Sequence, residues 1–208
     1  YSFVTYTSLL SDDLRRRDFT INAMAYHPSE GLVDLFGGIE DLENKIIRCV
    51  GQAKERFSED ALRMMRAIRF SAQLEFNIED ETFKAIKELA TTLSKISAER
   101  IREEMLKLLL SDNPIYFRLF YETGLTTVFM PEFDKAMETN QPHHMYSVGE
   151  HILHALENSE KDKAIRLTML FHDIAKPETL TIDEDGITHF KGHPQVSAKM
   201  AGEIMTRL

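Results

Sequence analysis

The sequence predicts a mainly α protein that begins with a short α+β segment. Apolar residues recur with helical spacing over most of the chain after Gly51, whereas the preceding residues alternate short β-branched or aromatic runs with Gly-rich turns. A chain of 208 residues can bury a sizeable core, and its single cysteine, Cys49, excludes an intrachain disulfide. No apolar run approaches the roughly 20 residues of a membrane span. These observations favour a cytoplasmic protein with no membrane partner.

The N-terminal segment, residues 1–51, is expected to hold short strands and short helices. Residues 2–9 are rich in β-branched and aromatic side chains, which predicts a strand. Asp18 is predicted to cap a short helix that runs through Ile21 to Tyr26. The pattern then predicts a strand, a turn, a helix and a strand at residues 32–35, 37–38, 39–44 and 46–50.

Helical spacing dominates from residue 52 onwards. Ser58 is predicted as the N-cap of a helix that reaches about Ala72, because Glu59 and Asp60 would then lie favourably in its first turn. Two more helices are predicted by apolar stripes at Phe83, Ile86, Ala90 and Leu93 and at Ile101, Met105, Leu108 and Leu109.

The run Thr139-Asn140-Gln141-Pro142 predicts an internal boundary, so the expected parts are residues 1–51, 52–140 and 141–208. Residues 164–171 are apolar nearly all round and predict a buried helix. The remaining predictions are a helix around residues 148–156, a turn at 183–186 and a last helix from about Gln195.

The overall charge argues against a general affinity for nucleic acids. The chain has 25 Lys and Arg against 34 Asp and Glu, a net charge of −9, and binding to a nucleic-acid backbone depends on neutralising phosphates. Arginine is nevertheless concentrated in the first third of the chain, at positions 15, 16, 17, 56, 63, 66 and 69. This distribution indicates a local basic site within an acidic protein.

The first candidate site lies in the run RRDFTINA. Arg16 and Arg17 are suited to bidentate phosphate contacts, and the adjacent Asp18 can accept a hydrogen bond from a ribose hydroxyl. The alternative is a solvated arginine run before a helix-capping aspartate, which is the commoner meaning of a charge run.

The second candidate site lies in the run EDALRMMR. Asp60 and Arg63 are three residues apart on a predicted helix and would project from one face, with Glu59 placed to orient Arg63. Cytosine and adenine each present an amino donor beside a ring-nitrogen acceptor, so a carboxylate with a guanidinium complements both and mismatches uracil and guanine. The alternative is an ordinary salt-bridged helix face.

The third candidate site is a group of histidines around Asp173. His172 precedes it directly, His151 lies 21 residues before His172, and His193 lies 20 residues after Asp173. Imidazoles and a carboxylate on neighbouring helices form sites for divalent metals. The alternative is that each histidine is hydrogen-bonded and structural.

Two families resemble successive parts of this chain. The motifs RRDFTINAMAY, LVDLFGGIEDL and ERFSEDALRMMRAIRFSAQLEF, from about residue 8 to 110, resemble those of bacterial tRNA nucleotidyltransferases, the CCA-adding enzymes, and of the related poly(A) polymerases. The runs HHMYSVGEHILHAL, LTMLFHDIAKP and HFKGHPQVSA, at about 143–208, are similar to HD metal-dependent phosphohydrolases. The resemblance implies the end of a nucleotidyltransferase head, then an all-helical neck and body, then an incomplete HD-type helical domain.

The first resemblance implies nucleotide binding by seven residues. Arg17 would contact the triphosphate and Asp18 the ribose, while Asp60 and Arg63 would pair with the base of CTP or ATP. The supporting residues would be Asn22, Glu59 and Arg66.

The family's paired carboxylates, which hold Mg²⁺, precede the RRDFT motif. They are expected upstream of Tyr1, because nothing in residues 1–14 matches them and Asp12 and Asp13 are merely adjacent. This chain is therefore expected to carry the base-selecting and RNA-binding part, and not to polymerise alone.

The second resemblance implies a divalent transition metal bound by His151, His172 and Asp173, with His193 as a further candidate ligand. The family's last aspartate ligand would fall after Leu208.

The expected activity of the whole protein is addition of CMP and AMP, from CTP and ATP, to the tRNA 3′ end. Three alternatives remain open at this point. One is a poly(A) polymerase or an A-adding or CC-adding specialist, which shares the same motifs. The others are an HD phosphohydrolase with a helical binding module, and a non-catalytic RNA-binding protein.

Overall fold

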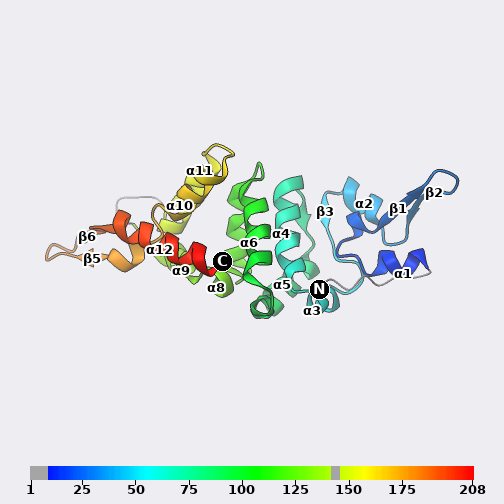
Figure 1. Ribbon diagram of the computed structural model, residues 1–208, viewed down its shortest axis with the longest axis horizontal. Coiled ribbons are helices and arrows are strands. Elements are labelled where there is room, and N and C mark those ends of the chain that lie inside the picture. Colours follow the sequence, from blue (N-terminus) through cyan, green and yellow to red (C-terminus); the bar gives the residue numbers. More distant parts are fainter. Residues whose placement is uncertain (1–8, 142–145) are drawn as a thin grey trace.

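A computed structural model describes residues 9–141 and 146–208 of the protein. The molecule is elongated, with the α+β segment at one end, parallel helices in the middle and a small hairpin at the other end (Figure 1). The predicted mainly α class is confirmed. The strand predicted at residues 2–9 lies outside the described residues apart from Leu9, which has extended backbone and precedes a helix.

The N-terminal segment differs from the prediction at its second helix. The helix expected from Ile21 to Tyr26 is wrong: a single 3-10 turn is followed by a strand that pairs antiparallel with the next one, Met24 opposite Asp34. Strand pairing overrides the local helical pattern here. The elements are α1 (Leu10–Arg15), η1 (Thr20–Asn22), β1 (Met24–His27), β2 (Gly31–Asp34), α2 (Gly38–Glu43) and β3 (Ile46–Ile47).

Close packing of α2 against η1 requires a glycine at position 38. A Cβ added to Gly38 would lie 2.4 Å from the carbonyl oxygen of Thr20, which is backbone and has no room to move. Gly38 therefore lets α2 support the segment that follows Arg17.

The helix predicted from Ser58 to Ala72 is in fact two helices, α3 (Ala53–Glu59) and α4 (Leu62–Leu74). Ser58 is not an N-cap: it lies in the last turn of α3, where its hydroxyl donates to the Lys54 carbonyl. The break falls at Asp60, whose backbone is extended and whose Oδ1 accepts from the Leu62 amide at 3.1 Å. An aspartate side chain bonded to the amide two residues ahead competes with the helix and starts a new one.

The middle of the molecule is built from packed helices, and both predicted apolar stripes contribute to its core. Only Phe83 of those eight residues is partly exposed. Edge-to-face aromatic pairs, such as Phe117 with Phe133 at 5.0 Å between ring centroids, fill the next layer. The elements are β4 (Asn77–Ile78, parallel to β3), α5 (Asp80–Leu89), η2 (Ala90–Lys95), α6 (Ala98–Leu109), η3 (Pro114–Phe117), α7 (Arg118–Glu122), α8 (Thr126–Phe129) and α9 (Pro131–Glu138).

The C-terminal part contains the predicted helices and turn. The helix expected to be buried all round is wrong in that respect, because Ala164 and Thr168 are exposed and line an open groove beside the last helix. No helix of the described residues is long and apolar enough to cross a membrane. The elements are α10 (Val148–Glu157), α11 (Lys163–Phe171), η4 (Lys176–Thr179), β5 (Thr181–Ile182), β6 (Thr188–His189) and α12 (His193–Arg207).

Candidate functional site

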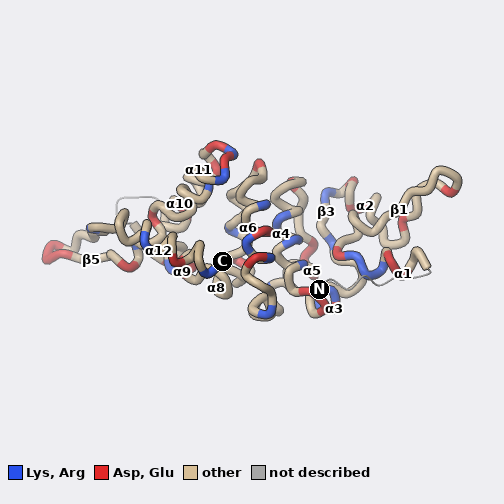
Figure 2. Tube along the Cα trace, viewed as in Figure 1, with Lys and Arg blue, Asp and Glu red and all other residues tan. Residues whose placement is uncertain are grey.

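A cavity of about 570 Å³ lies where the N-terminal segment meets α4 and α6. Its charged lining consists of five arginines and two aspartates, so it is positive although the chain as a whole carries −9. Figure 2 shows basic positions along the chain directly after α1 and along α4, the two segments that meet at this junction. The lining residues are Arg16, Arg17, Asp18, Asn22, Asp60, Leu62, Arg63, Arg66, Phe70 and Arg100.

The Asp18 carboxylate forms the buried floor of the cavity. Its Oδ2 accepts from Nε and Nη2 of Arg66 at 2.7 and 2.6 Å, and its Oδ1 accepts from the Phe19 amide and the Asn22 side chain at 2.9 and 3.2 Å. Four donors therefore occupy the roughly four acceptor positions of a carboxylate. The predicted helix cap is wrong, because the Phe19 amide that Asp18 accepts from precedes a 3-10 turn and a strand.

Asp60 and Arg63 lie on the same wall but do not share a helix face, because Asp60 is in the break between α3 and α4. Asp60 Oδ2 accepts from Arg100 Nη2 at 2.8 Å. Arg63 donates to the carbonyls of Arg56 and Arg16 at 3.2 and 3.0 Å, and to Glu59 at 2.8 Å. Within the described part of the chain, both side chains keep hydrogen-bonding capacity beyond these contacts.

Arg16 and Arg17 both form salt bridges with the Asp13 carboxylate rather than with Asp18. Arg16 Nη2 lies 2.6 Å from Oδ1 and Arg17 Nη2 lies 2.7 Å from Oδ2. The hydrogen bonds from Arg17 and Arg16 hold the pKa of Asp13 below its usual value. Both arginines are about half exposed at the cavity mouth, where an incoming anion meets them first.

The sequence did not indicate three of the lining residues, Leu62, Phe70 and Arg100. Arg100 comes from α6, 40 residues after Asp60, and no local spacing connects the two. Leu62 and Phe70 lie on α4, and the Arg69 guanidinium lies 3.8 Å from the ring centroid of Phe70. One predicted residue, Glu59, does not line the cavity but holds Arg63 from outside.

The predicted metal-binding residues are brought together in the C-terminal part. Nε2 of His172 lies 3.2 Å from Nε2 of His151, and these nitrogens lie 3.3 and 3.4 Å from Asp173 Oδ2. His193 approaches the other oxygen, Oδ1, at 3.2 Å. The potential ligand atoms of the first three residues all lie within 4.8 Å of one another, a spacing that one ion can bridge.

The orientation of the imidazoles suits a metal. Nδ1 of His172 lies 2.8 Å from the Met169 carbonyl, and Nδ1 of His193 lies 2.8 Å from the Phe190 carbonyl. Because a carbonyl oxygen only accepts hydrogen bonds, Nδ1 of both His172 and His193 carries a hydrogen. When the ring is neutral, its Nε2 therefore has a free lone pair, which lies on the side of Asp173. This is the arrangement that metal-binding histidines use.

Electrostatics within this group favours ionised Asp173. Burial acts to raise its pKa, but hydrogen bonds from His172 and Lys176 outweigh burial and place the pKa well below its ordinary value. The hydrogen bond to Asp173 raises the pKa of His172.

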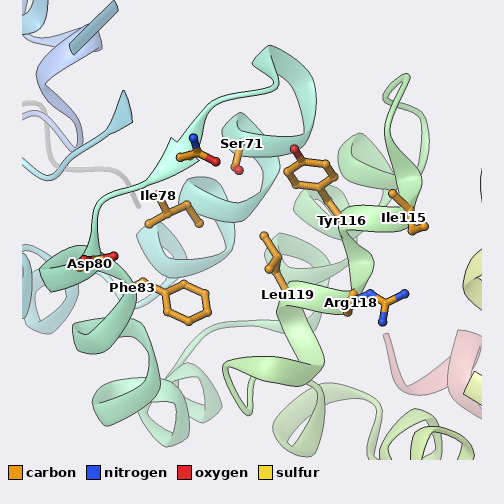
Figure 3. A pocket seen from close by; sticks show the side chains of 9 residues that line it. Ser71, Ile78, Asp80, Phe83, Ile115, Tyr116, Arg118 and Leu119 are labelled. Carbon is orange, nitrogen blue, oxygen red and sulfur yellow. The ribbon is translucent and has the colours of Figure 1, made fainter. Parts of the chain in front are cut away.

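A different cavity, of about 490 Å³, lies between α5 and α7 and has another character. In Figure 3 Ile78, Phe83 and Leu119 point toward its centre, while the Arg118 guanidinium points away. Glu150 accepts hydrogen bonds from Nη1 and Nη2 of Arg118 and so neutralises the charge of the guanidinium. An apolar cavity whose arginine is already paired lacks the charge to hold a phosphate.

Comparison with known families agrees with the position of the arginine-lined cavity. Residues 2–48 match the poly(A) polymerase head domain, and residues 75–137 match a domain described as a probable RNA and SrmB-binding site of polymerase A. Of the ten residues that line the cavity, four fall within the first match, five lie between the two matches at residues 60–70, and Arg100 falls within the second match.

Individual relatives carry a common name. The chain is 54% identical over 123 residues to a CCA-adding enzyme of Limosilactobacillus reuteri, covering 59% of this chain and 30% of the relative. It is 58% identical over 107 residues to a CCA-adding enzyme of Leuconostoc mesenteroides, covering 51% and 27%. The chain thus spans less than a third of the length of these relatives.

Solved structures give the same name. The chain resembles the Bacillus stearothermophilus CCA-adding enzyme in complex with CTP, with a TM-score of 0.58 and 27% identity over 97% of this chain and 60% of that one. It also resembles the Thermotoga maritima CCA-adding enzyme complexed with tRNA, with a TM-score of 0.60 and 26% identity over 95% and 44%.

Proposed function

Since this chain belongs to the family of CCA-adding enzymes and poly(A) polymerases, we propose that the complete protein adds CMP and AMP, from CTP and ATP, to the 3′ end of tRNA. The chain described above supplies the surface that selects the base and binds the nucleotide. The observation that carries the proposal is that Asp60 and Arg63 lie together on the wall of an arginine-lined cavity.

Base selection follows from the remaining hydrogen-bonding capacity of these two side chains. Asp60 accepts from the exocyclic amino group of the base, while Arg63 donates to the adjacent ring nitrogen. Beyond that nitrogen, the guanidinium meets the carbonyl oxygen of cytosine or the ring edge of adenine. Cytosine and adenine present that donor–acceptor order, whereas uracil and guanine place an acceptor opposite the carboxylate. One rigid pair therefore accepts two different nucleotides.

The triphosphate is held by the arginines at the cavity mouth. Arg17 and Arg16 are about half exposed and both pair with Asp13, so a triphosphate competes for them with a partly exposed carboxylate. Asp18 contributes by fixing Arg66 and Asn22, since its own acceptor positions are already occupied. A ribose hydroxyl reaches Asp18 only by replacing one of those donors.

Mg²⁺ is the metal expected for nucleotidyl transfer in this family. The carboxylates in and beside the cavity do not fit it, because Asp13 is neutralised by two arginines and Asp18 is saturated by Arg66 and its neighbours.

The test is incorporation of labelled CTP and ATP by the complete gene product. With tRNA lacking its terminal CCA, we expect two C residues and one A, and with tRNA ending in CC a single A. Repeated addition of A with ATP alone would instead identify a poly(A) polymerase. Binding of tRNA without incorporation of either nucleotide would leave a non-catalytic RNA-binding protein.

A second function is proposed for the C-terminal part, where His151, His172 and Asp173 form a site for a divalent transition metal. The two imidazole ligands favour Zn²⁺, Ni²⁺, Co²⁺ or Fe²⁺ over Mg²⁺. A bound metal of this kind supplies an activated water for phosphoester hydrolysis. The protein's own residues position the ligands, as the Met169 carbonyl does for the His172 ring.

This second proposal is tested on the complete gene product by elemental analysis and by hydrolysis of a 2′,3′-cyclic nucleotide. We expect bound metal and hydrolysis in the wild type and loss of both in His172→Ala. Equal metal content and equal hydrolysis in both proteins would return His172 to a structural role.

A further inference from the structure

Lys176 is a largely shielded cation that contacts the histidine group. Its Nζ lies 2.7 Å from Asp173 Oδ2, the same oxygen that faces Nε2 of His172 and His151, and its side chain is 14% exposed. An ammonium this far from water is held where it is by its partners, because burying a charge is costly unless it is paired.

The second partner of Lys176 connects it to another element. Nζ also donates to Oε1 of buried Gln141 at 2.9 Å, and Gln141 donates to the Ser147 carbonyl at 3.4 Å. The Ser147 hydroxyl caps α10 by accepting from the Glu150 amide, and α10 carries His151. One ammonium thus joins the carboxylate to the segment that starts the helix of an imidazole ligand.

The geometry points to Lys176 as a positioning residue for the metal site, a role that rests on the second function proposed above. It holds one acceptor position of Oδ2 and so fixes the rotation of the Asp173 carboxylate. His193 fixes the other oxygen at 3.2 Å. The remaining acceptor positions then face His151 and His172, the side on which these residues would hold a cation.

Two effects of the ammonium oppose each other. Its charge repels a divalent cation, which weakens binding, whereas its hydrogen bonds hold the ligands in place, which strengthens binding. Orientation dominates here because Asp173 is only 6% exposed and has little water to replace a lost donor. Outer partners that orient metal ligands typically change metal affinity by roughly 10- to 100-fold.

The test measures Co²⁺ and Zn²⁺ affinity of the complete protein by equilibrium dialysis, together with the visible spectrum of the Co²⁺ form. We expect Lys176→Met to weaken binding by roughly 10- to 100-fold and to alter the Co²⁺ spectrum. Lys176→Gln retains a donor without the charge, so it should recover part of the affinity. Lys199→Met, at an exposed position of α12, is the matched control and should bind like the wild type.

The outcomes separate this inference from the metal site itself. Wild-type affinity, or tighter binding, in folded Lys176→Met would show that repulsion dominates and would overturn the positioning role while the site stands. No binding by the wild type would remove both. Should Lys176→Met fail to fold, Gln141→Leu removes the second anchor without touching Asp173, and unchanged affinity there would also overturn the inference.

Discussion

The arginine-lined cavity and the histidine group differ in size, in charge and in the way the chain brings their residues together. The cavity draws its lining from three stretches spread between Arg16 and Arg100, carries excess positive charge and is wide enough for a nucleotide. The histidine group places its nitrogen and oxygen atoms 3.2 to 3.4 Å apart around one buried carboxylate. In the functions proposed above, the first would receive a large anion through many partly independent contacts, whereas the second would receive one small cation through a few interdependent ones.

This difference predicts different responses to substitution. Loss of one ligand from a small metal site removes a large part of its affinity, because the remaining groups cannot move to compensate. Loss of one arginine from a group of five weakens binding gradually, as neighbouring charges remain. The effects below are ordered from the largest to the smallest.

The largest effect is expected for Asp173→Asn. Because partners that only orient ligands already change affinity by roughly 10- to 100-fold, removing the charged ligand should lower Zn²⁺ affinity by more than about 100-fold in equilibrium dialysis. CTP binding should be unchanged. Asp183→Asn is the matched control, since that exposed carboxylate pairs only with His189 among the described ionic groups. Comparable Zn²⁺ affinity in both variants would contradict the role of Asp173 as the central metal ligand.

Arg66→Met should affect the folded state as well as nucleotide binding. It leaves Asp18, which is 8% exposed, without its ionic partner, and breaking a buried pair costs about 3–5 kcal/mol. Arg66 is partly exposed, so we expect a loss of roughly 2–3 kcal/mol in the free energy of urea unfolding. The exposed Arg102→Met on α6 should lose far less; an equal loss in both would show that the pair contributes nothing specific.

Arg63→Ala should reduce use of both nucleotides together. Amino-acid-to-base pairs are worth roughly 1–3 kcal/mol, so kcat/KM of the complete enzyme should fall by that amount for CTP and for ATP, and discrimination against UTP should weaken. A fall for one nucleotide only would mean that the two bases are read by different residues. Unchanged kcat/KM for both would remove Arg63 from the base-binding role.

The smallest effect concerns competition at the cavity mouth. Asp13→Asn releases Arg16 and Arg17 for the triphosphate, and exposed ion pairs are weak, so CTP affinity should rise only about two- to threefold. The arginines lower the pKa of Asp13, so it loses its charge only well below neutrality. The ratio of variant to wild-type affinity should therefore stay constant between about pH 6 and 8. A ratio that changes in this range would point to a different titrating group.

The sequence predicts the two regions unequally, for a physical reason. The histidine group depends on residues at the ends of amphipathic helices, which helical periodicity locates well. The cavity depends on a helix break at Asp60, whereas the acidic residues Glu59 and Asp60 predicted the first turn of a helix there. It also depends on Arg100, which reaches Asp60 only because α4 packs against α6. Contacts between segments that are distant in the sequence cannot be inferred from the spacing of residues along the chain.

The same limit explains the strand at Met24–His27. Its residues have no strong preference for a strand, and their conformation is fixed by pairing with Gly31–Asp34 across a turn. Gly31 supplies the positive φ that this turn requires, a signal that the sequence analysis did not use.

The break at Asp60 also restricts how substrate preference can evolve. Oδ1 starts α4 through the Leu62 amide while Oδ2 faces the cavity, so in the proposed function one side chain serves both the backbone and the base. Most replacements that alter the second task would also remove the acceptor that starts α4. Asparagine keeps a side-chain acceptor of the same length and offers a donor in place of the charged oxygen. Under the proposed function, very few substitutions at position 60 would therefore change the preferred base without weakening the start of this helix.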